Sequence, residues 1–132
     1  MTPKILFTAT GILFLLHGIG FFLGASDIAA MGVPELSPEA LNMAVGAHEI
    51  VAMFNIFLAF VLLAARNLEP DAAKKIAQGT ALGYIVLFAG VLYHMGSLIP
   101  EQAPPPMAGV IFGALTLWAC YIAFGKKEAS AA

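Results

Sequence analysis

Long runs of apolar residues alternate with short polar segments along the chain, and this pattern predicts the secondary structure. Four runs are long enough to cross about 30 Å of hydrocarbon as α-helices. They cover residues 5–23, 41–65, 76–99 and 107–124. Because short connections favour antiparallel neighbours, the sequence predicts an all-α, four-helix transmembrane bundle. Its topology is up-down-up-down, and residues 1–132 form one domain.

The first run resembles a secretory signal because Lys4 precedes it and small residues follow it. Its apolar stretch is longer than the roughly 7–15 residues of such a signal. We therefore expect residues 5–23 to be retained as a membrane span.

The composition agrees with an integral membrane protein. The 132 residues are 61% hydrophobic and 11% charged, whereas soluble chains are about 45–50% apolar and about 25% charged. The net charge of −2 and the lack of a clustered basic face exclude nucleic acid as a partner. The single Cys120 rules out an intrachain disulfide. The expected partners are the lipid bilayer and other membrane subunits, or further copies of the chain.

The distribution of basic residues predicts the orientation in the membrane. All six lie at the N-terminus, in the second connection or at the C-terminus: Lys4, Arg66, Lys74, Lys75, Lys126 and Lys127. The first and third connections, 24–40 and 100–106, contain acidic residues but no Lys or Arg. By the positive-inside rule both termini are cytoplasmic and these two connections lie outside. In a bacterial inner membrane, which is the expected location, outside means the periplasm.

Local signals mark the helix ends. Ser37 and Pro38 resemble an N-cap followed by proline in the first helical turn. Asp71 is expected to cap the third helix, and three prolines at 104–106 are expected to stiffen the third connection.

Glycines inside the predicted spans are candidate helix–helix contacts. Two small-xxx-small pairs and three single glycines are expected to let helix backbones approach closely. They are Gly79 with Gly83, Gly109 with Gly113, and Gly11, Gly18 and Gly90.

Four ionisable residues lie inside the apolar runs: His17, His48, Glu49 and His94. Ionisable side chains are costly in hydrocarbon and are therefore candidate functional residues. Counted from the helix ends, His17 and His48 are each about 10 Å deep and His94 about 8 Å deep. The sequence predicts one outward-facing layer that contains all four, with His17 and His94 on diagonal helices.

Three chemistries fit this layer. A transition metal accepts His nitrogen and Glu oxygen as ligands. Haem b needs two opposed histidines, for which His17 and His94 are the candidate pair. A quinone headgroup needs hydrogen bonds with a His and with Glu49, and its tail lies in lipid. No sequence spacing distinguishes the three, and the alternative for each His is a structural hydrogen bond donated to a neighbouring backbone carbonyl.

The segments GILFLLHGIGFFLG and GAHEIVAMFNIFLAFVLL in the first two runs resemble the DoxX-like family of small four-span membrane proteins. That family shares a Gly-rich first span and a glycine–glutamate motif that opens the second span, here Gly46 and Glu49. The resemblance covers the first half of the chain. Some DoxX-like proteins are subunits of membrane oxidoreductases that pass electrons to quinone, so the resemblance implies an electron-transfer role.

The sequence thus leads to a small membrane subunit whose His17, His48, Glu49 and His94 bind a redox cofactor, metal or quinone near the outer face. The competing interpretation is a non-catalytic accessory subunit of a larger membrane complex. A transporter is the third, and it would require oligomerisation to enclose a path.

Overall fold

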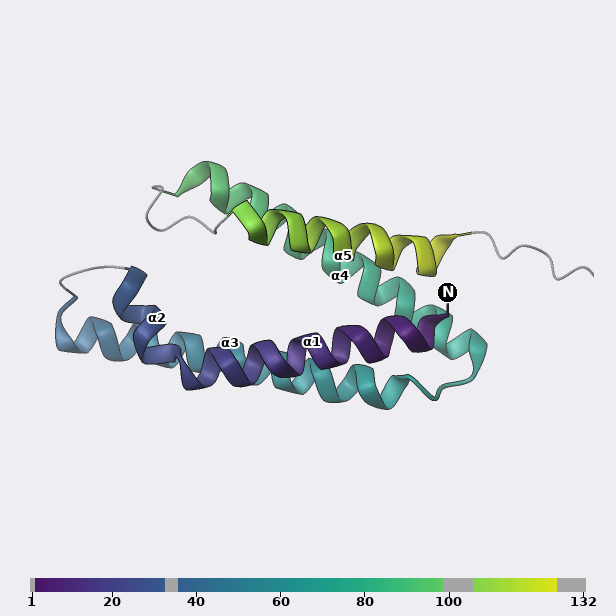
Figure 1. The fold of residues 1–132 in the computed structure, drawn as a ribbon, viewed down its shortest axis with the longest axis horizontal. Helices are drawn as coiled ribbons and strands as arrows, with labels where there is room; N and C mark the ends of the chain where they lie inside the picture. The colour runs from purple at the N-terminus through teal and green to yellow at the C-terminus, as the bar shows by residue number, and fades with distance from the viewer. Residues whose placement is uncertain (1, 33–35, 99–105, 126–132) are drawn as a thin grey trace, which may run out of the picture. The chain divides into compact units, whose positions relative to one another are not determined.

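The computed structural model describes residues 2–32, 36–98 and 106–125, and helices account for nearly all of them (Figure 1). They are α1 (Pro3–Leu23), α2 (Ala25–Gly32), α3 (Pro38–Ala65), α4 (Pro70–Ser97) and α5 (Pro106–Phe124). Every helix except α2 is long and apolar enough to cross a membrane. The described ranges contain no strand. The predicted all-α fold with four membrane-spanning helices is confirmed.

The chain divides into two compact units, which are described separately below. The α1–α3 unit is Phe7–Arg66, and the α4–α5 unit is Asn67–Ala132 together with Met1–Leu6. Several predicted features lie outside the described residues: positions 33–35 and 99–105 of the outer connections, and Lys126 and Lys127. The stiff proline segment is among them, except for Pro106, which begins α5.

The start of α3 follows the predicted cap. Ser37 is the N-cap residue, and its hydroxyl accepts a hydrogen bond of 3.3 Å from the Ala40 N–H. Pro38 occupies the first helical position, where its missing N–H costs nothing. The helix consequently begins three residues before the predicted start.

The predicted cap of α4 is wrong. Glu69 is the N-cap residue, makes no side-chain cap bond, and is followed by Pro70 in the first turn. Asp71 lies inside the first turn, where a carboxylate interacts favourably with the positive end of the helix dipole. The proline starts the helix six residues earlier than the apolar run suggests.

Helix α2 occupies a segment that was predicted to be a loop. The Gly24 N–H donates to the Gly20 carbonyl at 2.9 Å, and the Ile28 N–H donates to the Gly24 carbonyl at 2.9 Å. Helical hydrogen bonding therefore continues past Gly24, although Figure 1 shows α2 turned away from the direction of α1. Ala25 and Ala29 are buried, and α2 packs against α3.

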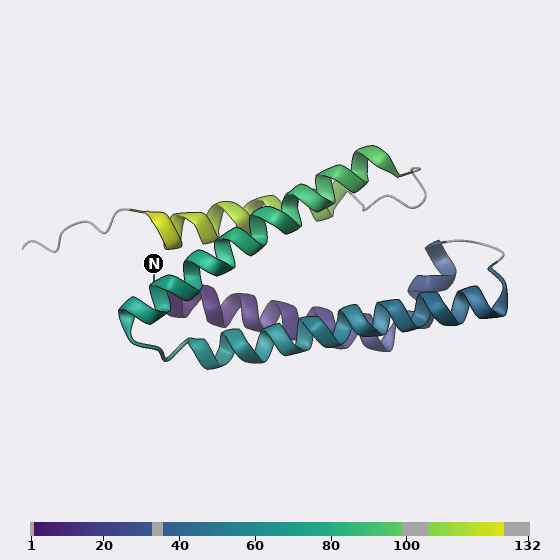
Figure 2. The same cartoon turned by 180° about the vertical axis from the view of Figure 1, so that it is seen from behind.

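Two glycines bring α1 and α3 into close contact, as predicted. A Cβ atom at Gly11 would lie 2.8 Å from Leu63 Cγ, and one at Gly18 would lie 2.7 Å from Ile56 Cγ1. The order of these contacts makes the two helices antiparallel, and Figures 1 and 2 show them side by side from both directions. The α1–α3 unit is therefore a tightly packed helix pair with α2 covering the N-terminal part of α3.

Helices α4 and α5 form the second antiparallel pair. The buried Thr116 hydroxyl lies 3.1 Å from the Tyr84 carbonyl and 2.7 Å from the Phe112 carbonyl, so it can donate across to α4 or within α5. Gly113 packs against the Phe88 ring, with 3.3 Å between an added Cβ and Phe88 Cε2, and Gly109 packs against Met95. The predicted packing is confirmed for this glycine pair. Gly79, Gly83 and Gly90 were also predicted to pack, but no atom of α5 comes within 4 Å of a Cβ added there.

Candidate functional site

His17 lies six residues before the end of α1 and is exposed. Its Nδ1 atom is 3.1 Å from the side-chain nitrogen of Asn55 on α3. An amide nitrogen only donates, so Nδ1 is the acceptor here and a neutral imidazole carries its proton on Nε2. His17 therefore presents an N–H donor, since Nε2 has no hydrogen-bond partner in the described part of the chain.

His48 has the opposite arrangement. Its Nδ1 atom is 2.7 Å from the backbone carbonyl of Ala44, one turn earlier in α3. A carbonyl only accepts, so the proton lies on Nδ1 and the neutral ring leaves a lone pair on Nε2. This bond to the backbone is the structural role that we considered for each His, and it leaves Nε2 of His48 available as an acceptor.

Phe21 links the two imidazoles. Its ring centroid is 5.1 Å from that of His17, in a stacked arrangement at 19°, and 5.2 Å from that of His48 at 40°. Residues four apart lie on the same face of a helix, which is why His17 and Phe21 meet. Phe21 was not predicted as a site residue, although its spacing of four residues from His17 is a usable signal in the sequence.

The predicted common depth of His17 and His48 is wrong. His17 is bonded to Asn55, and an added Cβ at Gly18 would lie 2.9 Å from the Ala52 carbonyl. His48 is two turns away from Asn55 along α3, which is about 10 Å. The error arose because each depth was counted from the end of its own apolar run, whereas α3 extends well past the end of α1.

Glu49 lies beside His48 but is turned about 100° around α3. In the register set by Gly18, the end of α1 at Leu23 falls close to Glu49. The side chain is half-buried. Its carboxylate makes no hydrogen bond or ion pair with any residue that the structure describes, so it is free to act on an external group.

His94 belongs to the other unit and lies in the last turn of α4. It is three residues from the end of the helix at Ser97, closer to that end than predicted. The ring is exposed and makes an edge contact with Tyr93 at 5.4 Å between centroids. A histidine here, when charged, interacts favourably with the negative end of the helix dipole. Its pairing with His17 stays a prediction.

The predicted metal-ligand set is not assembled within the α1–α3 unit. Over residues 2–32, 36–98 and 106–125, no three His, Cys, Asp or Glu side chains are grouped as a metal site requires. His17, His48 and Glu49 are thus neighbours along one helix pair without converging on one point. What the structure brings together is two imidazoles, one aromatic ring and the Asn55 amide.

Comparison with models of protein families, with curated proteins and with solved structures finds no match. The class of protein is therefore defined from its fold and its candidate site alone. The protein is a small all-α integral membrane protein, and one of its helix pairs carries two imidazoles joined by an aromatic ring.

Proposed function

We propose that the protein is a small membrane subunit of an electron-transfer complex and that its α1–α3 unit binds a quinone headgroup. The observation that carries this proposal is the Phe21 ring in contact with both imidazoles, each of which keeps a free Nε2 atom. A flat headgroup lying along the edges of these three rings makes apolar contact with Phe21 and can hydrogen-bond through its oxygens to the two Nε2 atoms. The apolar surface of the surrounding helices accommodates the tail.

This geometry supports a quinone better than a metal ion or haem b. A metal ion needs several ligands at one point, which the described residues do not provide. Haem b needs a second axial histidine opposite His17, and the candidate, His94, belongs to the other unit. A quinone needs only separate hydrogen-bonding groups along an aromatic surface.

Two sequence features support the proposed periplasmic location of the site and its proposed role in electron transfer. The asymmetry of basic residues supports cytoplasmic termini, which puts the Leu23 end of α1, and the site near it, toward the periplasm of a bacterial inner membrane. The resemblance of the first two spans to DoxX-like proteins supports transfer of electrons to or from quinone. Glu49 is the proposed proton acceptor.

The test is a binding titration on the full chain in lipid nanodiscs with decylubiquinone as probe. Replacing His17 or Phe21 with Leu is expected to weaken binding about 2- to 10-fold each, the worth of one hydrogen bond or ring contact. Asn42→Leu is the matched control, because Asn42 is an exposed polar residue on α3 far from His17. Elemental analysis and an absorption spectrum accompany the titration. A stoichiometric metal, a Soret band, or no decylubiquinone binding would contradict the proposal.

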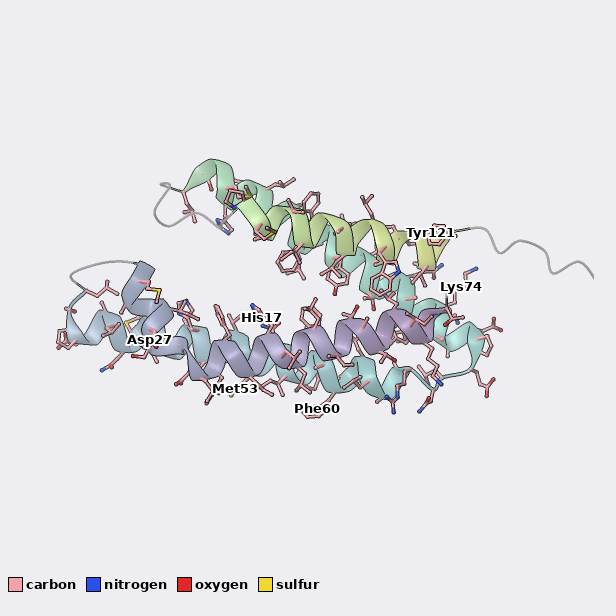
Figure 3. All side chains as sticks on the ribbon, in the orientation of Figure 1. His17, Asp27, Met53, Phe60, Lys74 and Tyr121 are labelled. Atoms are coloured by element: carbon pink, nitrogen blue, oxygen red, sulfur yellow. The ribbon has the colours of Figure 1, made fainter. Side chains whose placement is uncertain are left out.

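A second candidate function, the accessory subunit, is favoured by a different surface. Large apolar side chains on α3 are about half exposed or more: Ile50, Met53, Phe54, Phe57 and Phe60. In Figure 3, Met53 and Phe60 project from the opposite side of the helix pair from His17. Co-purification with a larger complex whose activity survives His17→Leu and Phe21→Leu would favour the accessory role.

A further inference from the structure

The two imidazoles present opposite hydrogen-bonding atoms to a ligand. The Asn55 amide occupies Nδ1 of His17, which leaves Nε2–H as a donor. The Ala44 carbonyl occupies Nδ1–H of His48, which leaves Nε2 as an acceptor. Both rings contact Phe21, and a headgroup that spans the edge of Phe21 from one imidazole to the other would meet a donor from α1 and an acceptor from α3.

We propose that this pair selects the reduced form of its ligand, a hydroquinone, over the oxidised quinone, and that Asn55 is the positioning residue that fixes the donor. This inference rests on the proposed function. It goes beyond it by assigning the preferred redox state and a role for Asn55.

The preference for hydroquinone follows from which atoms of the ligand and of the two imidazoles donate hydrogen bonds and which accept them. A quinone carbonyl only accepts, so it bonds to His17 Nε2–H but faces the lone pair of His48 without a proton to share. A hydroquinone hydroxyl both donates and accepts. The reduced form therefore bonds to both rings, and one additional hydrogen bond corresponds to about 3- to 10-fold tighter binding.

Asn55 acts through His17 and touches no ligand itself. Without the amide donor, His17 loses the partner that holds its proton on Nε2, and both tautomers become populated. The backbone bond of His48 lies within α3 and does not involve Asn55. Replacement of Asn55 is therefore expected to change His17 alone.

The first measurement is ¹⁵N NMR of histidine-labelled full chain in nanodiscs without ligand. We expect His17 protonated at Nε2 and His48 protonated at Nδ1. Asn55→Leu, which is nearly isosteric, is expected to mix the tautomers of His17 and leave His48 unchanged, and Asn55→Ala is the second variant if Leu prevents folding. Asn42→Leu is expected to change neither ring. An unchanged His17 in the Asn55 variants, or a wild-type His48 protonated at Nε2, would overturn the assignment.

The second measurement is an anaerobic titration with decylubiquinol and decylubiquinone in parallel. The wild type is expected to bind the quinol about 3- to 10-fold more tightly. His48→Gln, whose amide can turn either an oxygen or an N–H toward the ligand, is expected to bring this ratio near one. If the wild type binds both forms equally, the preference for hydroquinone is refuted but the proposed quinone-binding function is not. Failure of both forms to bind refutes the proposed function and the preference with it.

Discussion

The contact of Gly18 with α3 offers the sharpest test of the packing on which the site depends. In Gly18→Ala the new Cβ would lie 2.7 Å from Ile56 Cγ1, 2.9 Å from the Ala52 carbonyl oxygen and 3.1 Å from the Ile56 nitrogen. The last two are backbone atoms, so no side-chain rotation relieves the clash. The helices must separate, and His17, the adjacent residue, moves away from Asn55.

A matched variant isolates the cost of this clash. Gly20 lies on the same helix, and a Cβ added there meets nothing within 4 Å. Alanine in a helix interior is more stable than glycine by about 0.5–1 kcal/mol, and both variants share this gain. Overpacking costs about 1–3 kcal/mol. We therefore expect Gly20→Ala to raise the free energy of unfolding and Gly18→Ala to lie about 1–3 kcal/mol below it.

The assay is reversible unfolding of the full chain in mixed micelles, with helix content followed by circular dichroism. Gly11→Ala adds an internal check, because its two closest contacts are Leu63 side-chain atoms at 2.8 and 3.0 Å and its nearest backbone contact, the Ala59 carbonyl oxygen, is 3.2 Å away. Leu63→Ala should partly rescue Gly11→Ala, whereas Ile56→Ala should not rescue Gly18→Ala. If Gly18→Ala and Gly20→Ala are equally stable, the close approach of α1 and α3 is refuted.

Five further substitutions test three other features of the packing by the same unfolding measurement. Ser37→Ala removes the cap of α3 and is expected to cost about 1 kcal/mol; an unchanged stability would mean that the first turn does not depend on the hydroxyl. Thr116→Val should lower the free energy of unfolding by about 0.5–1.5 kcal/mol if its hydroxyl donates to the α4 backbone. This loss should exceed the loss in Thr80→Val, because the Thr80 hydroxyl bonds only within its own helix. Gly83→Ala should stabilise by about 0.5–1 kcal/mol, and Gly113→Ala by less because of the Phe88 ring; the reverse order would contradict the α4–α5 packing.

The four membrane-spanning helices could be predicted because each contains an uninterrupted apolar run of about the length that crosses a bilayer. Their exact ends depended on local chemistry that runs of apolar residues do not show. Pro70 begins α4 in polar sequence, and α2 is a helix of eight residues inside a predicted loop. Such a short helix depends on its packing against α3 rather than on its own sequence.

The site could be predicted only in part, because sequence identifies polar residues but not the residues opposite them. Identical small-xxx-small patterns at Gly79 and at Gly109 behave differently: the second packs against the partner helix and the first does not. The pairing of His17 with Asn55 depends on the same register. Depth counts on separate helices cannot supply it, which is why His17 and His48 were placed at one level.

Substitution of Glu49 distinguishes a role in ligand binding from a role in stability more clearly than substitution of either histidine does. The histidines each use one ring nitrogen inside the protein, so their removal affects stability and binding together. Glu49 is half-buried and its carboxylate has no partner in the part of the chain that the structure describes. Because an unpaired carboxylate loses hydration on burial and gains nothing in return, Glu49→Gln should leave the free energy of unfolding unchanged or raise it. If Glu49 accepts a hydrogen bond from a bound hydroquinone, the same variant should weaken decylubiquinol binding while decylubiquinone binding changes little. A loss of stability without loss of binding would instead assign Glu49 to the framework of the helix pair.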